Sequence, residues 1–164
     1  MITAFLGLGS NLGDREASLV AARADLEAHP RIRLDRSSGL FSTAAVGGPP
    51  NQPDYLNAVL RIATSLPPAV LLAFCHELEQ RAGRERQIRW GARTLDVDVL
   101  CYDALVLNAP DLQLPHPRLH ERRFVLEPLC DLVPDWPHPV SGETFASLLN
   151  KLPVSGVQRV RTIW

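Results

Sequence analysis

Residues 95–101, LDVDVLC, constrain the fold more than any other stretch of the chain. Successive side chains of a β-strand point to opposite faces of a sheet. The apolar residues here alternate with Asp96 and Asp98, so the segment is predicted to be a strand with one face against a core and two carboxylates on the other face. Mg²⁺ binds through one or two carboxylates together with substrate phosphates, and the pair is therefore a candidate metal site. A solvated strand face is the competing interpretation.

Positive charge gathers just before this strand. The segment 83–93 holds four arginines and a tryptophan, which are Arg84, Arg86, Arg89, Arg93 and Trp90. Carboxylates for metal next to guanidinium groups for phosphate are what phosphoryl transfer requires, because its catalysis is mostly positioning and charge stabilisation. Arginine is also the usual cation of this chain, since Lys151 is its single lysine. The arrangement, and not the number of arginines, therefore favours a catalytic function.

Composition excludes several classes of protein. The 164 residues are expected to form a single domain, and the net charge of −1 argues against a polycation that holds nucleic acid. No apolar stretch approaches the ~20 residues that span a bilayer, and the N-terminus lacks the basic region of a signal peptide. The three cysteines are widely spaced without a zinc-binding pattern, which favours reduced thiols. We therefore expect a cytoplasmic protein without a membrane partner.

Periodicity and breakers predict alternating strands and helices. The predicted strands cover 2–8, 32–43, 55–64, 95–101, 105–107 and 157–163, and the predicted helices cover 14–28, 68–80, 121–131 and 144–152. Residues 7–13, GLGSNLG, resemble a dinucleotide fingerprint, but the third glycine comes one position too late, which favours a strand-to-helix turn. The segment 44–53 is rich in proline and glycine and is expected to be a mobile loop beside a site.

Two further groups of residues are candidates for binding. Tyr55 and Asn57 share one face of their strand and could hold a flat heterocycle by stacking and paired hydrogen bonds, although an ordinary edge position explains them equally well. The segment 114–124, LPHPRLHERRF, places two histidines and three arginines within eight residues. This second cluster is a candidate anion site.

Five segments together resemble the 6-hydroxymethyl-7,8-dihydropterin pyrophosphokinase family of folate biosynthesis. They are GLGSNLGD (7–14), QPDYLNAV (52–59), GRERQIRWGARTLDVDVL (83–100), LPHPRLHERRFVLEPL (114–129) and Val133-Pro134. The resemblance implies an α+β, ferredoxin-like fold with a mainly antiparallel sheet covered by helices. It also implies transfer of the diphosphoryl group of ATP to the hydroxymethyl group of the pterin, with release of AMP.

The resemblance also assigns roles to residues. The implied ligands of two Mg²⁺ ions are Asp96 and Asp98, and the implied catalytic residues are Arg84, Arg93 and Asp98, the last as a hypothetical base for the hydroxyl proton. The implied pterin site comprises Thr43, Val46, Tyr55, Asn57, Trp90 and Phe124. The implied ATP site comprises His76, Glu79, Arg84, Arg86, Arg89, Arg93, His116 and Arg122. The segment 83–93 would close over both substrates as a lid.

Two rival functions remain open from the sequence. One is another Mg²⁺-dependent nucleotide transferase that uses Asp96 and Asp98. The other is a ferredoxin-like RNA-binding module, against which the near-neutral charge and the acidic strand argue. The expected partners are two small molecules, ATP and the pterin. We expect no nucleic-acid partner, and we expect the protein to be a monomer.

Overall fold

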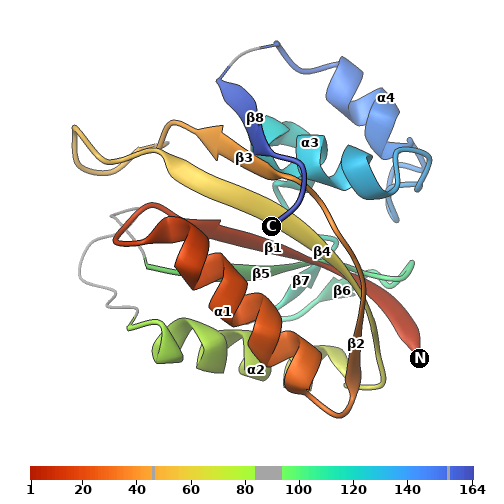
Figure 1. The fold of residues 1–164 in the computed structure, drawn as a ribbon. Helices are drawn as coiled ribbons and strands as arrows, with labels where there is room; N and C mark the ends of the chain where they lie inside the picture. Colours follow the sequence, from red (N-terminus) through yellow and green to blue (C-terminus); the bar gives the residue numbers. More distant parts are fainter. Residues whose placement is uncertain (46, 84–93, 155) are drawn as a thin grey trace.

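The computed structural model describes residues 1–45, 47–83, 94–154 and 156–164. Figure 1 shows three layers, in which helices α1 and α2 lie on one face of a central sheet and α3 and α4 lie on the other. The strands are β1 (Ile2–Ser10), β2 (Ile32–Ser37), β3 (Leu40–Thr43), β4 (Tyr55–Thr64), β5 (Asp96–Tyr102), β6 (Leu107–Asn108), β7 (Gln113–Leu114) and β8 (Val157–Arg161). The helices are α1 (Arg15–Ala28), α2 (Pro68–Arg81), the 3-10 turn η1 (Leu119–Glu121), α3 (Arg123–Leu132) and α4 (Phe145–Asn150).

The sheet topology is the one expected for a ferredoxin-like fold. The strand order is β5-β1-β4-β3-β8, with β2 also paired to β4, and every pairing is antiparallel. Because β2 and β3 occupy successive parts of the same edge of β4, the first part of the chain follows a β-α-β-β-α-β order. The predicted α+β class is confirmed.

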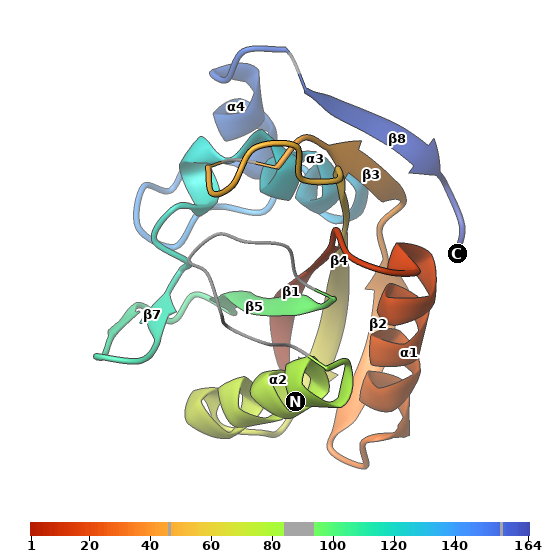
Figure 2. The same cartoon turned by 90° about the vertical axis from the view of Figure 1, so that its left-hand side faces the viewer.

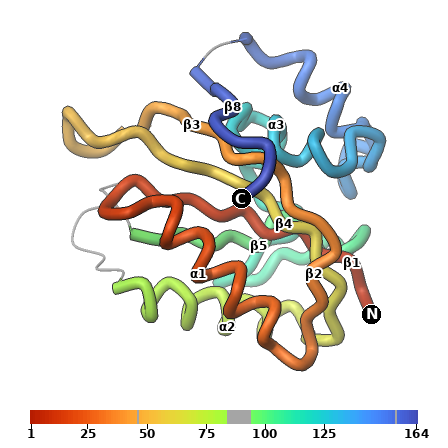
Figure 3. Tube along the Cα trace, in the orientation of Figure 1, coloured from red at the N-terminus to blue at the C-terminus, as the bar shows by residue number. Residues whose placement is uncertain are grey.

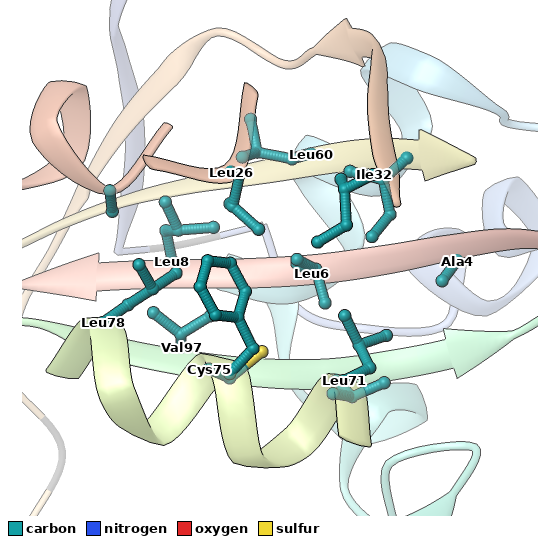
Figure 4. Packing of buried hydrophobic residues seen from close by; sticks show 14 of the residues in the cluster. Ala4, Leu6, Leu8, Leu26, Ile32, Leu60, Leu71, Cys75, Leu78 and Val97 are labelled. Carbon is teal, nitrogen blue, oxygen red and sulfur yellow. The ribbon is translucent and has the colours of Figure 1, made fainter. Parts of the chain in front are cut away.

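One core fills the space between the sheet and helices α1 and α2. Asp14 begins α1 by accepting a hydrogen bond from the backbone N–H of Ala17 at 3.1 Å, and Leu19, Ala22 and Leu26 face the sheet as their spacing predicts. Figure 4 shows Leu26 and the α2 residues Leu71, Cys75 and Leu78 against Leu6 and Leu8 of β1 and Val97 of β5. This core holds the apolar face of the predicted Asp96 strand.

A second core separates the sheet from α3 and α4. Phe5, Val59 and Leu100, from three adjacent strands, pack against the apolar sides of these helices. The ring of Phe5 meets Trp136 edge-on at 5.2 Å between centroids. Figure 2 shows this helical layer on the side of the sheet that α1 and α2 leave uncovered. The sheet is therefore covered by helices on both faces, and a site on it needs a gap in one layer.

The structure corrects two predicted boundaries. The predicted strand 32–43 is two strands, because the Ser38 hydroxyl accepts the N–H of Val59 and donates to the carbonyl of Gly39, which breaks the ladder at 38–39. The first strand runs on to Ser10, so Gly7 and Gly9 lie within β1 and not in a turn. The turn follows at Gly13, where φ is +70°.

The short strand predicted at 105–107 begins two residues later and ends one residue later in the structure. The structure has β6 at Leu107–Asn108, which pairs with β7 in a separate small hairpin. The last strand, β8, returns alongside β3 and completes the far edge of the large sheet, as the tube in Figure 3 allows the reader to follow. The start of β8 at Val157 therefore lies next to the loop that follows β3, and the C-terminal Trp164 lies beside Ser38, before β3.

Candidate active site

A cavity of about 650 Å³ opens on the face of the sheet that carries α3. Its walls come from strands β1, β3, β4, β5 and β8 and from residues that lie between strands, namely 44–45, 116–125 and Gly156. The lining residues are Gly7, Leu8, Gly9, Thr43, Ala44, Ala45, Tyr55, Asn57, Ala58, Val59, Asp96, Asp98, Leu100, His116, Arg118, Glu121, Arg122, Arg123, Phe124, Val125, Gly156 and Val157. Four of the five motif segments named from the sequence, 7–14, 52–59, 83–100 and 114–129, thus meet in one place.

The floor of the cavity is a row of paired residues across three strands. Gly9 of β1 lies opposite Asp96 of β5 on one side and opposite Asn57 of β4 on the other. Directly paired residues place their side chains on the same face of a sheet. A Cβ atom at Gly9 would lie 3.2 Å from Asn57 Oδ1 and 3.5 Å from the Tyr55 ring, so glycine leaves the space between the carboxylate and the carboxamide open.

Asp96 and Asp98 are half-buried and both line the cavity. They lie side by side because they are two residues apart on β5, while Val97 between them points into the opposite core. In the described part of the chain, no group of three or more His, Cys, Asp or Glu residues is arranged to hold a metal ion by itself. A pair of hard oxygen donors in an open cavity fits Mg²⁺, which keeps water and substrate ligands, better than it fits a closed protein cage.

A hydrogen bond to a side chain of α2 fixes the backbone between the two aspartates. Glu79 of α2 is 3% exposed, and its Oε1 accepts a hydrogen bond from the N–H of Val97 at 2.9 Å. Glu79 therefore lies between α2 and β5, buried against the strand that carries the aspartates. Glu79 and the exposed His76 do not line the cavity, so their predicted contacts with ATP stay predictions.

His116 stands beside the aspartates with a defined protonation state. Its Nδ1 accepts the backbone N–H of Arg118 at 3.2 Å, which leaves the proton of the neutral ring on Nε2. Burial, followed by the nearby charge of Arg122, lowers the pKa of His116 to about 4, although Asp96 opposes this shift. The ring is therefore a neutral hydrogen-bond donor at pH 7.

Arg122 and Phe124 form the opposite wall. The Arg122 guanidinium lies over the Phe124 ring at 5.6 Å from its centroid. Burial and the charge of Arg118 lower the pKa of Arg122, whereas Asp98 and Asp96 act in the opposite direction. A guanidinium group remains charged at neutral pH, so this wall offers a cation to an anionic ligand.

The other end of the cavity is suited to a flat polar ring. Thr43, Tyr55 and Phe124 line it, and Asn57 lies between them with 7% of its surface exposed. Asn57 Nδ2 is buried and has no hydrogen-bond partner among the described residues. Buried amide groups are normally paired, so this donor is available to a ligand.

Several predicted residues lie outside the described part of the chain. They are Val46, Arg84, Arg86, Arg89, Trp90 and Arg93. Their predicted roles stay predictions. Arg118 lines the cavity and belongs to the second cluster, which the sequence offered as a candidate anion site. Glu121 was given no role from the sequence, but it also lines the cavity, and its Oε1 lies 3.0 Å from Arg118 Nε in an ion pair. Their signal was the density of charge in residues 116–123. Nothing in the pattern indicated that Gly156 and Val157 would also line the cavity.

Comparison with known proteins gives a consistent result. The model of the 7,8-dihydro-6-hydroxymethylpterin-pyrophosphokinase (HPPK) family matches residues 5–134. A 2-amino-4-hydroxy-6-hydroxymethyldihydropteridine pyrophosphokinase from Methylorubrum extorquens is 42% identical over 160 residues, which cover 98% of this chain and 99% of the relative. The bifunctional protein FolKE of Lactococcus lactis is 41% identical over 133 residues, which are 81% of this chain but 38% of that protein.

Solved structures agree at the level of the fold. A Plasmodium falciparum HPPK-DHPS structure superposes with a TM-score of 0.69 at 14% identity, covering 92% of this chain and 43% of that one. Another HPPK-DHPS structure, determined in complex with substrates, gives a TM-score of 0.71 at 12% identity and covers 92% of this chain and 43% of that one. The chain therefore spans less than half the length of these two-part proteins.

Proposed function

This chain belongs to the 7,8-dihydro-6-hydroxymethylpterin-pyrophosphokinase family, and we propose how its own residues carry out the reaction of that family. The enzyme transfers the diphosphoryl group of ATP to 6-hydroxymethyl-7,8-dihydropterin, which yields AMP and the pterin diphosphate in folate biosynthesis. The observation that supports the residue assignments is the row Asp96–Gly9–Asn57, which joins a carboxylate pair and a carboxamide within one cavity.

The pterin occupies the end of the cavity next to Asn57. Its ring lies between Tyr55 and Phe124, and Asn57 Nδ2 donates to an acceptor on the ring edge, which satisfies the buried donor. The backbone at Thr43 and Val46 contributes further hydrogen bonds, and Trp90 completes the pocket. Stacking between aromatic rings holds the plane of the heterocycle, while the carboxamide selects its edge.

The triphosphate occupies the end next to the aspartates. His116 donates from Nε2, and Arg122 supplies a half-buried charge to the phosphate oxygens. Preorganised donors of this kind stabilise the charge that develops during transfer. Arg84 and Arg93 act as catalytic cations, and the remaining predicted contacts to ATP are His76, Glu79, Arg86 and Arg89.

Asp96 and Asp98 would hold two Mg²⁺ ions, which when bound would supply charge neutralisation to the triphosphate. Asp98 also accepts the hydroxyl proton of the pterin. Both aspartates are half-buried on a strand whose backbone is fixed by Glu79, so their positions require little ordering when substrates bind.

The protein works as a single domain and as a monomer, in the cytoplasm, without nucleic acid. Cys75, Cys101 and Cys130 are free thiols, which suits a reducing compartment. In the described residues, no helix has both the length and the apolar character needed to cross a membrane. The other nucleotide transferase and the RNA-binding module gain no support from the family match or from the relatives.

AMP formation from Mg-ATP, with and without 6-hydroxymethyl-7,8-dihydropterin, tests these assignments. Wild type should form AMP only with the pterin, and Asp96→Asn should lose at least about a hundredfold in rate, since ligand loss at a catalytic metal removes charge stabilisation. Asn57→Ala should instead weaken pterin binding by about tenfold or more while Mg-ATP binding is kept. Equal activity in Asp96→Asn and wild type would refute the metal assignment.

A further inference from the structure

A second cavity, of about 360 Å³, lies outside the active site. It is formed by the β6–β7 hairpin, the segment that follows it and the turn before α4. The lining residues are Leu107, Asn108, Gln113, Leu114, Pro115, His116, Pro117, His120, His138 and Val140. Three imidazoles and two carboxamides thus surround one space, and none of its lining residues is acidic. No assigned role uses His120 or His138.

His138 lines this cavity and has a buried ring nitrogen without a partner among the described residues. His138 is only 7% exposed. Its Nδ1 accepts the backbone N–H groups of Val140 at 3.2 Å and Ser141 at 3.3 Å. The neutral ring therefore carries its proton on Nε2. That atom is buried and has no hydrogen-bond partner among the described residues, which is costly for a polar group.

This tautomer decides between two kinds of ligand. A metal ion at Nε2 would need the lone pair there and a proton on Nδ1, but Nδ1 already accepts two N–H groups. The described residues also contain no group of three potential ligands arranged around a metal. The imidazole instead requires an acceptor, and oxygen is the ordinary acceptor for such a donor.

A second imidazole and a carboxamide add donors. His120 is exposed, with its ring 6.0 Å from that of His138 between centroids and nearly perpendicular to it. Gln113 Nε2 donates to Asn108 Oδ1 at 3.3 Å, so the Nδ2 group of Asn108 remains a donor. With donors in its wall and no carboxylate, the cavity is complementary to negative charge.

We propose that this cavity is a binding site for a small oxyanion, a carboxylate or a phosphate, with His138 as the buried donor and His120 as the second donor at its mouth. Burial, followed by the proximity of His120, lowers the pKa of His138, whereas Glu143 opposes the shift, so the His138 ring acts as a neutral donor. His116 lines both cavities, which places the anion directly beside the wall of the active site.

The test is a histidine side-chain NMR titration of the full chain at pH 6.5 and constant ionic strength. The active site is first saturated with three ligands: the pterin, Mg²⁺ and a methylene analogue of ATP. Added anions then meet only the second cavity. Inorganic phosphate and acetate are titrated separately, which distinguishes the two sources of the oxyanion. The expected result is a saturable shift of the His138 and His120 signals, with His138 in the Nε2–H form before any addition.

Two variants make the test specific. In His138→Asn, the carboxamide oxygen takes the position of Nδ1, so the variant keeps the acceptor for the turn and removes the Nε2 donor. The affinity for phosphate or acetate should then fall at least about tenfold. His29→Asn is the matched control, because His29 Nδ1 accepts the N–H of Arg31 at 3.1 Å in the same way but lies in neither cavity. This control should bind like wild type.

Three results would overturn the proposal. The first is an absence of saturable shifts with both anions, which would leave only water at the His138 donor. The second is unchanged affinity in a folded His138→Asn variant. The third is a His138 ring protonated on Nδ1 that binds Zn²⁺ more tightly than either anion. None of these outcomes bears on AMP formation, so the transfer reaction is tested separately.

Discussion

Glu79 Oε1 accepts the backbone N–H of Val97 at 2.9 Å, and Val97 is the residue between the two aspartates of the active site. Glu79→Ala would leave this N–H without a partner and open a space in the core. We expect a loss of unfolding free energy of about 2–4 kcal/mol, measured by urea denaturation.

Glu79→Gln keeps an oxygen acceptor of the same length and should cost less stability than Glu79→Ala. If Glu79 positions the aspartates, then Glu79→Ala should also raise the Mg²⁺ concentration needed for half-maximal rate, and the glutamine variant should partly restore it. Equal stability of the two variants would show that the Val97 hydrogen bond contributes little.

Gly9 should act as a determinant of pterin binding. In Gly9→Ala, the new Cβ would lie 3.2 Å from Asn57 Oδ1, so the carboxamide must shift by a few tenths of an ångström. We expect the KM for the pterin to rise by about fivefold, with a smaller change for ATP, because one misplaced hydrogen bond is worth about 1 kcal/mol. Steady-state kinetics measures both constants.

Gly13→Ala is the matched control for that substitution. Gly13 has φ of +70° but nothing within 4 Å of an added Cβ, so alanine there strains the turn without approaching the cavity. It should lower stability by about 1 kcal/mol and leave both KM values unchanged. A larger pterin effect in Gly13→Ala than in Gly9→Ala would contradict the role of the open floor.

Arg118 and Glu121 should change ATP binding in opposite directions. Both residues line the cavity, and Glu121 pairs with the Arg118 guanidinium when no nucleotide is bound. Arg118→Gln should raise the KM for ATP severalfold, whereas Glu121→Gln should lower it or leave it unchanged, because the arginine is then released toward phosphate. Stronger ATP binding by Arg118→Gln would exclude a contact between Arg118 and the nucleotide.

His116 should make the protein less stable as the pH falls from 6.5 to 4. The ring has a pKa of about 4 when folded, against 6.5 as its ordinary value, so within this range the unfolded chain binds a proton that the folded chain does not. The free energy of unfolding therefore decreases as the pH falls through this window and is unaffected by this ring above it. Denaturation without Mg²⁺ and nucleotide at several pH values measures the effect.

His116→Asn provides the comparison, because Asn can accept the N–H of Arg118 but does not titrate. The difference in unfolding free energy between wild type and variant should shrink or change sign as the pH falls to 4. A difference that is constant with pH would mean that the folded ring titrates near its ordinary pKa. The remaining histidines and carboxylates contribute to both proteins and cancel in the difference.

Local order in the sequence determined much of the fold. The alternation around Asp96 and Asp98 predicted a strand with one polar face, because the two-residue period of a strand leaves no other arrangement. The spacing of Leu19, Ala22 and Leu26 predicted the buried side of α1 for the same kind of reason. Motif order alone was enough to indicate the family and its α+β fold.

Only the tertiary structure decided which residues face the same space. Sheet register places Gly9 between Asp96 and Asn57, although these residues are far apart in the sequence. Helix packing buries Glu79 beneath Val97, and the turn before α4 brings His138 to His120. Periodicity tells which way a side chain points from its own element, whereas its neighbours depend on how the elements pair and pack, and those long-range contacts leave no local pattern in the chain.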